Sequence, residues 1–120
     1  KTIGIISPYM PIANKHITQF FTDVGFSVES FIGLQCPSPV EIAHVTADEL
    51  SEALDQVDGT GIDALVQFGT NLHFMEQAAV EEEKRQKPVI AINSASYWHT
   101  LRLKNINARY KKYGRLLAEF

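Results

Sequence analysis

The chain has 120 residues, of which 45% are apolar and 21% are charged, and these values are ordinary for one globular domain. They exclude a disordered tail, a coiled coil and a collagen-like chain, and no apolar run reaches the roughly 18–20 residues of a membrane-spanning helix. The net charge of −3 argues against nucleic acid as a partner, and a single cysteine excludes a disulfide framework and a four-thiolate zinc site. Since the N-terminus has no feature of a signal peptide, we expect a cytoplasmic protein.

The ends of the chain and its charge distribution carry further information. Residue 1 is Lys rather than Met, and the second residue already begins a predicted strand. We therefore expect a fragment of a longer protein; the alternative is a trimmed tag or terminus. Six basic residues lie between Arg102 and Arg115. Because no basic stripe lies elsewhere, we interpret them as a solvated or partner-facing surface and not as a nucleic-acid arm.

The first third of the chain predicts a strand, a helix and a second strand. Thr2–Ser7 is a short apolar run ended by Pro8, which is typical of a buried strand. A helix that stops at Gly25 follows, with one apolar face formed by Ile17, Phe20, Phe21 and Val24. Phe26–Leu34 alternates apolar and polar residues and predicts the second strand. Two prolines in Gln35–Pro39 exclude regular structure from the next loop.

The middle of the chain begins with a capping box in Thr46–Glu49, where the Thr hydroxyl and the Glu carboxylate each satisfy a backbone amide. The helix that it starts has a predicted buried stripe of Ala47, Leu50, Leu54 and Val57. After a turn, Asp63–Phe68 predicts the third strand. Gly69-Thr70-Asn71 then leads into a helix from about Leu72 to Arg85.

The last part of the chain predicts one more strand and one more helix. Pro88–Ile92 forms the fourth strand, and either Ser94 or Ser96 caps a helix that runs to about Leu103. Strands that alternate with helices form right-handed βαβ units. We therefore expect an α/β fold, with a flavodoxin-like four-stranded parallel sheet in the order 2-1-3-4 and helices on both faces.

In such a sheet, ligands bind beyond the carboxyl ends of the strands, where the strand order reverses. Strands 1 and 3 flank that point here, so the loops to search are Ser7–Asn14 and Gly69–His73, with Asn93–Trp98 beside them. A tyrosine after strand 1 can donate its phenol to an oxyanion, or it can cover the end of the core.

The glycine turn after strand 3 has two readings. Gly69 lets the backbone approach a ligand, the free amides there favour an anion, and Thr70 and Asn71 add side-chain donors. The alternative is a capped strand-to-helix turn with no ligand. The residues therefore predict an anion-friendly cleft and leave its use open.

Other chemistry has little support in the sequence. No glycine-rich dinucleotide or P-loop motif is present. His73 and Glu76 share a helical face, which we interpret as a surface pair and not a metal site. Cys36 lies between an apolar strand and two prolines with no neighbouring His or Lys, and we interpret it as a structural thiol. The residues therefore give no support to a metal site or to a dinucleotide or P-loop nucleotide site.

Several ordered motifs resemble the C-terminal half of the maleate cis-trans isomerase and arylmalonate decarboxylase family, within the aspartate/glutamate racemase superfamily. The family has a T-P-Y turn after a strand, a G-L segment that leads to N-x-E-I-A, an S-C-T-N-L turn, G-K-P-V followed by S-N-Q-A-x-x-W, and a closing G-Y-G-R-L-L. The matching segments here are Ser7–Tyr9, Gly33-Leu34, Pro39–Ala43, Phe68–Leu72, Gln86–Val89, Ile92–Trp98 and Lys112–Leu117.

The resemblance implies one half of a pseudo-twofold, racemase-like fold. Family enzymes bind a small dicarboxylate between two similar α/β domains, use cysteine as nucleophile or proton donor, and need no cofactor. The chain, residues 1–120, would then be the C-terminal domain of a two-domain enzyme. Its expected partners are the dicarboxylate and the missing N-terminal domain or a second copy of the chain, with no nucleic acid and no membrane.

Two departures from the family pattern limit the chemistry that the resemblance implies. The family cysteine is replaced by Gly69, which can neither attack nor donate a proton, and the family asparagine is replaced by Pro39. The resemblance keeps Tyr9 as a catalytic donor and Ser7, Gly69, Thr70 and Asn71 as substrate-binding residues. Because the family cysteine is missing, the isolated domain is expected to be inactive. The alternatives are a non-catalytic carboxylate-binding pseudoenzyme domain and a stand-alone flavodoxin-like interaction module.

Overall fold

The computed structural model describes residues 1–120 and contains one parallel sheet of four strands. The strand order is β2-β1-β3-β4, with β1 paired to both β2 and β3. The predicted fold class and strand order are therefore confirmed. Strand β1, Thr2–Ser7, has the predicted bounds, and the other three are slightly shorter than predicted: β2 Ser27–Gly33, β3 Ala64–Gln67 and β4 Val89–Ala91.

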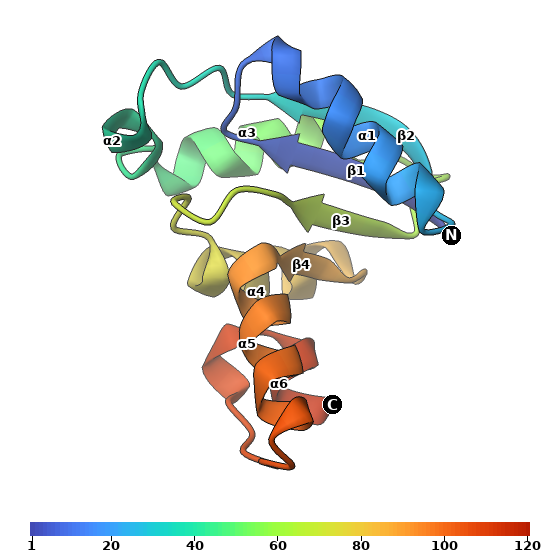
Figure 1. Cartoon of the computed structure of the whole chain (residues 1–120), viewed down its shortest axis with the longest axis vertical. Coiled ribbons are helices and arrows are strands. Elements are labelled where there is room, and N and C mark those ends of the chain that lie inside the picture. The colour runs from blue at the N-terminus through green and yellow to red at the C-terminus, as the bar shows by residue number, and fades with distance from the viewer.

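Helices cover both faces of this sheet (Figure 1). In that view α1 and α5 lie in front of the sheet and α3 lies behind it, as a doubly wound fold requires. The α-helices are α1 Asn14–Asp23, α2 Pro39–Ile42, α3 Ala47–Val57, α4 Met75–Arg85, α5 Ile92–Leu103 and α6 Arg115–Glu119; the 3-10 turns are η1 Pro11–Ala13 and η2 Lys111–Tyr113. None of these helices combines the length and the apolar character that a bilayer span needs.

The core has one large and one small cluster. The large cluster joins α3 and α4 to the sheet, with Leu50, Leu54 and Leu65 at or near zero exposure. The small cluster joins Ile3 and Ile5 of the first strand to α1. Burying a side chain of this size contributes about 1.5–3 kcal/mol, so these two clusters hold the loops at the strand ends on a rigid base.

The start of α3 agrees with the predicted capping box. The Glu49 amide donates to Thr46 Oγ1 at 3.3 Å, and the Thr46 amide donates to Glu49 Oε2 at 2.7 Å. The predicted buried stripe needs one correction, because Ala47 is exposed and Ala53 is buried in its place. Ala47 is the first residue of the helix, and the buried residues of the helix begin only at Leu50, one turn later.

Other expectations of local structure are also corrected. A short helix, α2, begins at Pro39 inside the segment that two prolines were expected to keep irregular, because proline is favoured at the first helical position. On α1 only Ile17 is buried, whereas Phe20 and Val24 are more than half exposed. The Phe20 ring lies against Phe21 instead, at 5.2 Å between centroids.

The elements that flank the candidate site differ most from the prediction. Helix α4 begins at Met75 and not near Leu72. Strand β4 passes directly into α5 at Ile92, so Asn93 lies in the first helical turn. Neither serine caps this helix, and Ser94 is buried against the rest of the domain.

A charge network joins α3 to α4 at the opposite end of the sheet from these loops. Arg85, whose side chain is 7% exposed, pairs with Glu81 at 2.8 Å, Asp58 at 3.1 Å and Asp55 at 2.6 Å. Burial raises the pKa of Asp58, but hydrogen bonds from Lys87 and Arg85 outweigh it and lower that pKa below its ordinary value. Burial also raises the pKa of Glu81, but hydrogen bonds from Ser51 and Arg85 outweigh it, and the pKa lies below its ordinary value.

Candidate functional site

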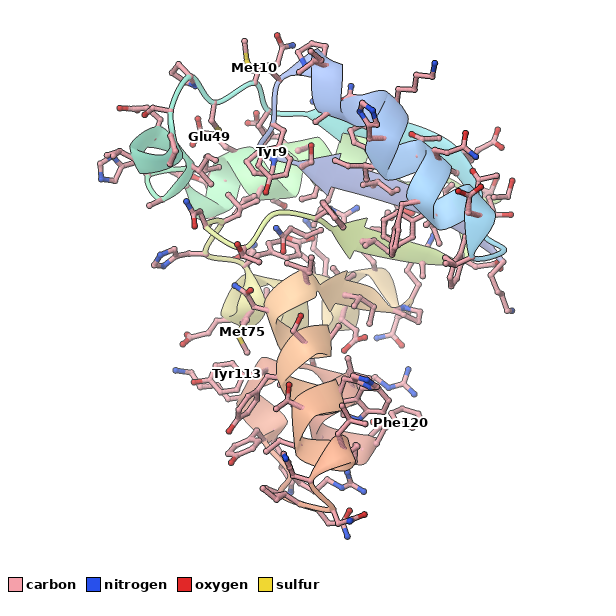
Figure 2. All side chains as sticks on the ribbon, in the orientation of Figure 1. Tyr9, Met10, Glu49, Met75, Tyr113 and Phe120 are labelled. Carbon is pink, nitrogen blue, oxygen red and sulfur yellow. The ribbon has the colours of Figure 1, made fainter.

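The loops after β1 and β3 meet at the carboxyl end of the sheet, where the strand order reverses. Figure 2 shows the Tyr9 side chain at this end of the molecule. The Tyr9 ring is half-buried and packs against both core clusters. Both predicted segments therefore lie at one edge, as the strand order requires.

The Tyr9 ring lies beside the glycine turn. A Cβ atom placed on Gly69 would lie 3.6 Å from Tyr9 Cζ, the ring carbon that carries the hydroxyl. It would also lie 2.5 Å from Pro8 Cδ, which is closer than real side chains approach. Because Gly69 also has a φ of +130°, both the space and the backbone at this position favour glycine.

The next two residues of the turn are exposed, and their backbone amides are free. The Gly69 carbonyl accepts a hydrogen bond from the Leu72 amide at 3.3 Å, which closes the turn. The N–H groups of Thr70 and Asn71 donate to no acceptor in the chain. Adjacent unpaired N–H groups of a turn form a concavity that suits an anion.

Ser7 differs from the other predicted site residues because it is completely buried. Its hydroxyl has no hydrogen-bond partner, and neither has the buried Oδ1 atom of Asn14 at the start of α1. The burial of Ser7 argues against direct contact between its hydroxyl and a ligand. It lies beneath the loop that carries Tyr9.

A hollow of about 380 Å³ lies beside the turn, between the start of α4 and the first turn of α5. Thr70, His73, Asn93 and Tyr113 are among the residues that line it; none of its lining residues is Lys or Arg, and its one carboxylate, that of Glu76, is paired with Lys112. An anion at the turn would therefore depend on amides and hydroxyls and not on a cation of this hollow.

Two residues at this edge were not predicted as parts of the site. Gln67, the last residue of β3, is 1% exposed and bonds to the Gly69 turn. The signal for it in the sequence is one polar residue at the end of an otherwise apolar strand. Tyr113 comes to the hollow from η2, more than 40 residues along the chain from Thr70, and no local pattern predicts that approach.

Cys36 packs against the large core cluster and lines a different hollow, with Glu49 and Val45 of the α3 region. Burial raises the pKa of its thiol, and the carboxylates of Glu49 and Glu41 raise it further despite a hydrogen bond from the backbone. A thiol with a raised pKa stays protonated and is a poor nucleophile. This agrees with the interpretation of Cys36 as a structural thiol.

His73 and Glu76 do not form the expected surface pair. Glu76 instead binds Lys112 of η2 at 2.7 Å, because α4 begins only at Met75 and its first turn faces the C-terminal segment. No group of three or more His, Cys, Asp or Glu side chains is arranged to hold a metal ion.

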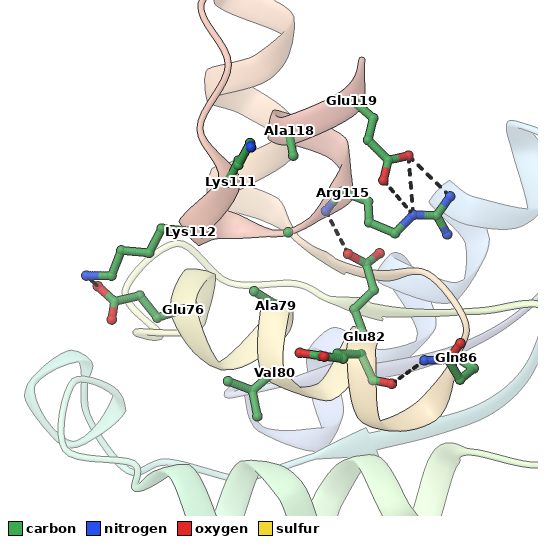
Figure 3. Close-up of a pocket in the computed structure, with 12 residues that line it drawn as sticks. Glu76, Ala79, Val80, Glu82, Gln86, Lys111, Lys112, Arg115, Ala118 and Glu119 are labelled. Atoms are coloured by element: carbon green, nitrogen blue, oxygen red, sulfur yellow. Dashed lines mark hydrogen bonds and ion pairs between the residues drawn. The ribbon is translucent and has the colours of Figure 1, made fainter.

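The largest hollow, of about 650 Å³, lies away from the strand ends, between α4 and the C-terminal segment (Figure 3). Several of its charged groups are paired, including Glu76 with Lys112 and Arg115 with Glu119. Glu82, 6% exposed, accepts from the Arg115 amide at 2.8 Å and from the Val89 amide at 3.3 Å. Gly114, with a φ of +89°, passes close to the same carboxylate. We interpret this hollow as a structural joint between β4 and α6.

Comparison with known proteins agrees with this fold. The sequence model of arylmalonate decarboxylase matches residues 1–117. A maleate isomerase from Alcaligenes faecalis is 22% identical over an alignment of 120 positions, which covers 98% of this chain and 47% of that protein. The chain therefore spans about half the length of the curated relative that it matches.

Solved structures show the same fold. The Nocardia farcinica maleate cis-trans isomerase bound to TRIS superposes with a TM-score of 0.93 at 19% identity, over 99% of this chain and 49% of that one. A crystal structure of arylmalonate decarboxylase superposes with a TM-score of 0.83 at 18% identity, over 97% of this chain and 52% of that one. At these identities the likeness establishes the fold alone.

Proposed function

Because the chain belongs to the arylmalonate decarboxylase family, we propose that it is the C-terminal domain of a cofactor-independent enzyme that binds a small dicarboxylate between two α/β domains. The half-length match to the maleate isomerase supports a second domain outside this chain. A second copy of the chain is the alternative occupant of that position. Maleate, the compound in the name of that relative, is the first ligand to test.

The observation that carries the proposal is the Gly69 turn beside the Tyr9 ring. The free amides of Thr70 and Asn71 can donate to one carboxylate, and their exposed side chains can add a hydroxyl and an amide donor. The Tyr9 phenol can donate to the same oxygen atoms, because its ring lies beside the turn. Donors that are fixed before the ligand arrives favour an anion without further reorganisation.

This domain would bind the substrate and stabilise its charge, while the reactive group would come from the other domain. In a decarboxylation, the bond between the α-carbon and one carboxyl carbon breaks and carbon dioxide leaves with that carbon. The electron pair stays on the remaining carboxylate as an enediolate, which then takes a proton at the α-carbon. Gly69 has no thiol to supply that proton. One cysteine in the partner domain suffices for this step, whereas racemisation through two cysteines would not be possible.

A second candidate function is a carboxylate-binding domain without catalysis. The ring of Pro8 fills the space where a Cβ of residue 69 would lie, which supports a turn that has no room for the family thiol. The sequence of the other domain of the parent protein distinguishes the two functions. A cysteine in the turn that corresponds to Gly69 favours the enzyme. A stand-alone interaction module is favoured if the protein binds no dicarboxylate.

The proposal is tested by titrating the ¹⁵N-labelled protein with maleate and following the amide resonances. We expect the Thr70 and Asn71 amides to shift, and Tyr9→Phe to weaken binding by about tenfold or more, because hydrogen bonds to charged groups contribute about 1.5–3 kcal/mol. Tyr97→Phe is the matched control: it removes a phenol on α5 that bonds to Tyr110 at 3.4 Å. Equal affinities for Tyr9→Phe and the wild type would contradict the proposed site.

A further inference from the structure

Gln67 is a polar side chain in a position that strands usually fill with an apolar one. It is 1% exposed at the end of β3, and both ends of its amide are bonded. Its Nε2 atom donates to the Gly69 carbonyl at 2.7 Å, and its Oε1 atom accepts from the Ile92 amide at 3.4 Å. Burying an amide costs free energy unless it is hydrogen-bonded. Gln67 therefore ties the turn to the start of α5, and at 1% exposure its side chain is not open to a ligand.

Asn93 makes a second connection between the same two segments. Its Nδ2 atom donates to the Thr70 carbonyl at 3.0 Å from the first turn of α5. Two successive carbonyls of the turn, those of Gly69 and Thr70, thus accept from side-chain amides. The Gly69 carbonyl also accepts from the Leu72 amide, at 3.3 Å, and the bond from Gln67 is the shorter of the two. Both connections depend on the absence of a loop between β4 and α5, which brings Ile92 and Asn93 to this edge.

The orientation of the carbonyls determines the orientation of the amides. A trans peptide unit is planar, so the N–H of one residue points opposite to the carbonyl of the residue before it. The Thr70 N–H therefore points away from Gln67, and the Asn71 N–H points away from Asn93. Neither N–H donates to an acceptor in the chain. If either carbonyl were released, the peptide could rotate and turn its N–H inwards.

We propose that Gln67 and Asn93 are positioning residues, which hold the Gly69–Asn71 turn so that its two free amides stay directed towards a carboxylate. The inference rests on the proposed function, because it assigns to these residues the geometry of that same anion site. Neither residue touches the ligand. Gln67 fixes the peptide between Gly69 and Thr70, and Asn93 fixes the peptide between Thr70 and Asn71. Because these bonds reach Ile92 and Asn93 at the start of α5, the affinity for a carboxylate would depend on how β4 joins α5.

The test compares maleate affinity among variants by the same amide titration. Gln67→Leu removes both bonds of the buried amide and keeps a similar size. Asn93→Ala removes the same donor at a half-buried helical position and adds no charge beside the carboxylate site. Ser30→Ala is the matched control, because Ser30 also donates to a backbone carbonyl, that of Val57 at 2.6 Å, but on a strand and helix away from the turn.

We expect Gln67→Leu and Asn93→Ala each to raise the dissociation constant for maleate by about tenfold or more. Ser30→Ala should leave that constant unchanged although it also loses a hydrogen bond. Folding is checked by urea unfolding, which a purely structural role would change in all three variants alike. If maleate shifts the Thr70 and Asn71 amides of the wild type and binds both positioning variants equally well, the inference is overturned and the proposed function stands.

A different result separates the two claims. If maleate leaves the wild-type amides of Thr70 and Asn71 unmoved, the proposed function fails. The inference about geometry is then decided without a ligand, by the ¹³Cα shifts of residues 69–71, which report backbone dihedral angles. Shifts that change in Gln67→Leu and not in Ser30→Ala support the positioning role, and identical shifts in Gln67→Leu and the wild type overturn it.

Discussion

A side chain at residue 69 should destabilise the domain for two separable reasons. The φ of +130° is a conformation that L-residues rarely adopt, which costs about 1–3 kcal/mol. The new Cβ would also lie 2.5 Å and 2.7 Å from two carbons of the Pro8 ring, and overpacking of this kind costs about 1–3 kcal/mol more. We therefore expect Gly69→Ala to lower the free energy of unfolding by about 2–6 kcal/mol, and Gly69→Cys to lower it at least as much.

Two other glycines separate these contributions. Gly25 has a φ of +95°, and a Cβ atom added to it would have no atom within 4 Å, so Gly25→Ala measures the backbone cost alone. Gly61 has neither the strained φ nor a close neighbour, so Gly61→Ala should change stability by less than about 0.5 kcal/mol. Combining Pro8→Ala with Gly69→Ala should relieve the clash and leave the backbone cost.

The assay is urea unfolding monitored by far-ultraviolet circular dichroism. The urea midpoints are converted to free energies of unfolding with one m-value for all variants. We expect Gly69→Ala to destabilise the domain most, Gly25→Ala less, and Gly61→Ala least. A Gly69→Ala variant as stable as Gly61→Ala would refute the reasoning, since it would show that the Pro8 ring and the backbone adapt without cost. In that case the turn could also accept the family thiol.

The remaining predictions concern stability and activity. Arg85→Met should cost about 3–5 kcal/mol in urea unfolding, because it leaves the buried Glu81 carboxylate with only Lys84, at 3.7 Å, as a cationic partner, and adding Glu81→Leu should recover most of the loss. Since the folded-state pKa values of Asp58 and Glu81 are lowered, their contribution is present at neutral pH. It should be lost as the pH falls below their ordinary values of 3.8 and 4.5; an unchanged melting temperature from pH 6 to pH 3 would contradict this. Gly114→Ala should cost about 1–3 kcal/mol by the same unfolding assay, because its φ is +89° and its Cβ would lie 3.2 Å from Glu82 Oε2; a loss no larger than that of Gly61→Ala would contradict it. The purified 120-residue chain should convert no maleate in a proton-NMR time course, because it has no thiol at the turn; measurable turnover would contradict the division of roles between two domains.

The sequence predicts the sheet well because its signals are local. Apolar runs of strand length, the Thr46 capping box and the alternation of strands with helices each depend on a few neighbouring residues, and parallel βαβ units leave few possible strand orders. The same signals place Tyr9 and Gly69 at one edge of the sheet. How closely the two residues approach, however, depends on the ring of Pro8 and on the φ of the turn.

The parts that could not be predicted depend on distant contacts. Asn93 reads as a loop residue after an apolar strand, but α5 begins without a loop and turns its side chain to Thr70. Gln67 reads as a minor irregularity in a strand, and its role needs the positions of both Gly69 and Ile92. Phe20 and Val24 fit the helical period but lie on a face that the sheet does not cover.

The most direct test of the account is a crystal structure of this protein with maleate at saturating concentration. The account predicts one carboxylate of maleate within hydrogen-bond distance of the Thr70 and Asn71 amides and of the Tyr9 hydroxyl, with the Gln67 and Asn93 bonds to the turn intact. Maleate bound only elsewhere, for instance in the hollow at Glu82, or a turn whose amides point inwards, would contradict it.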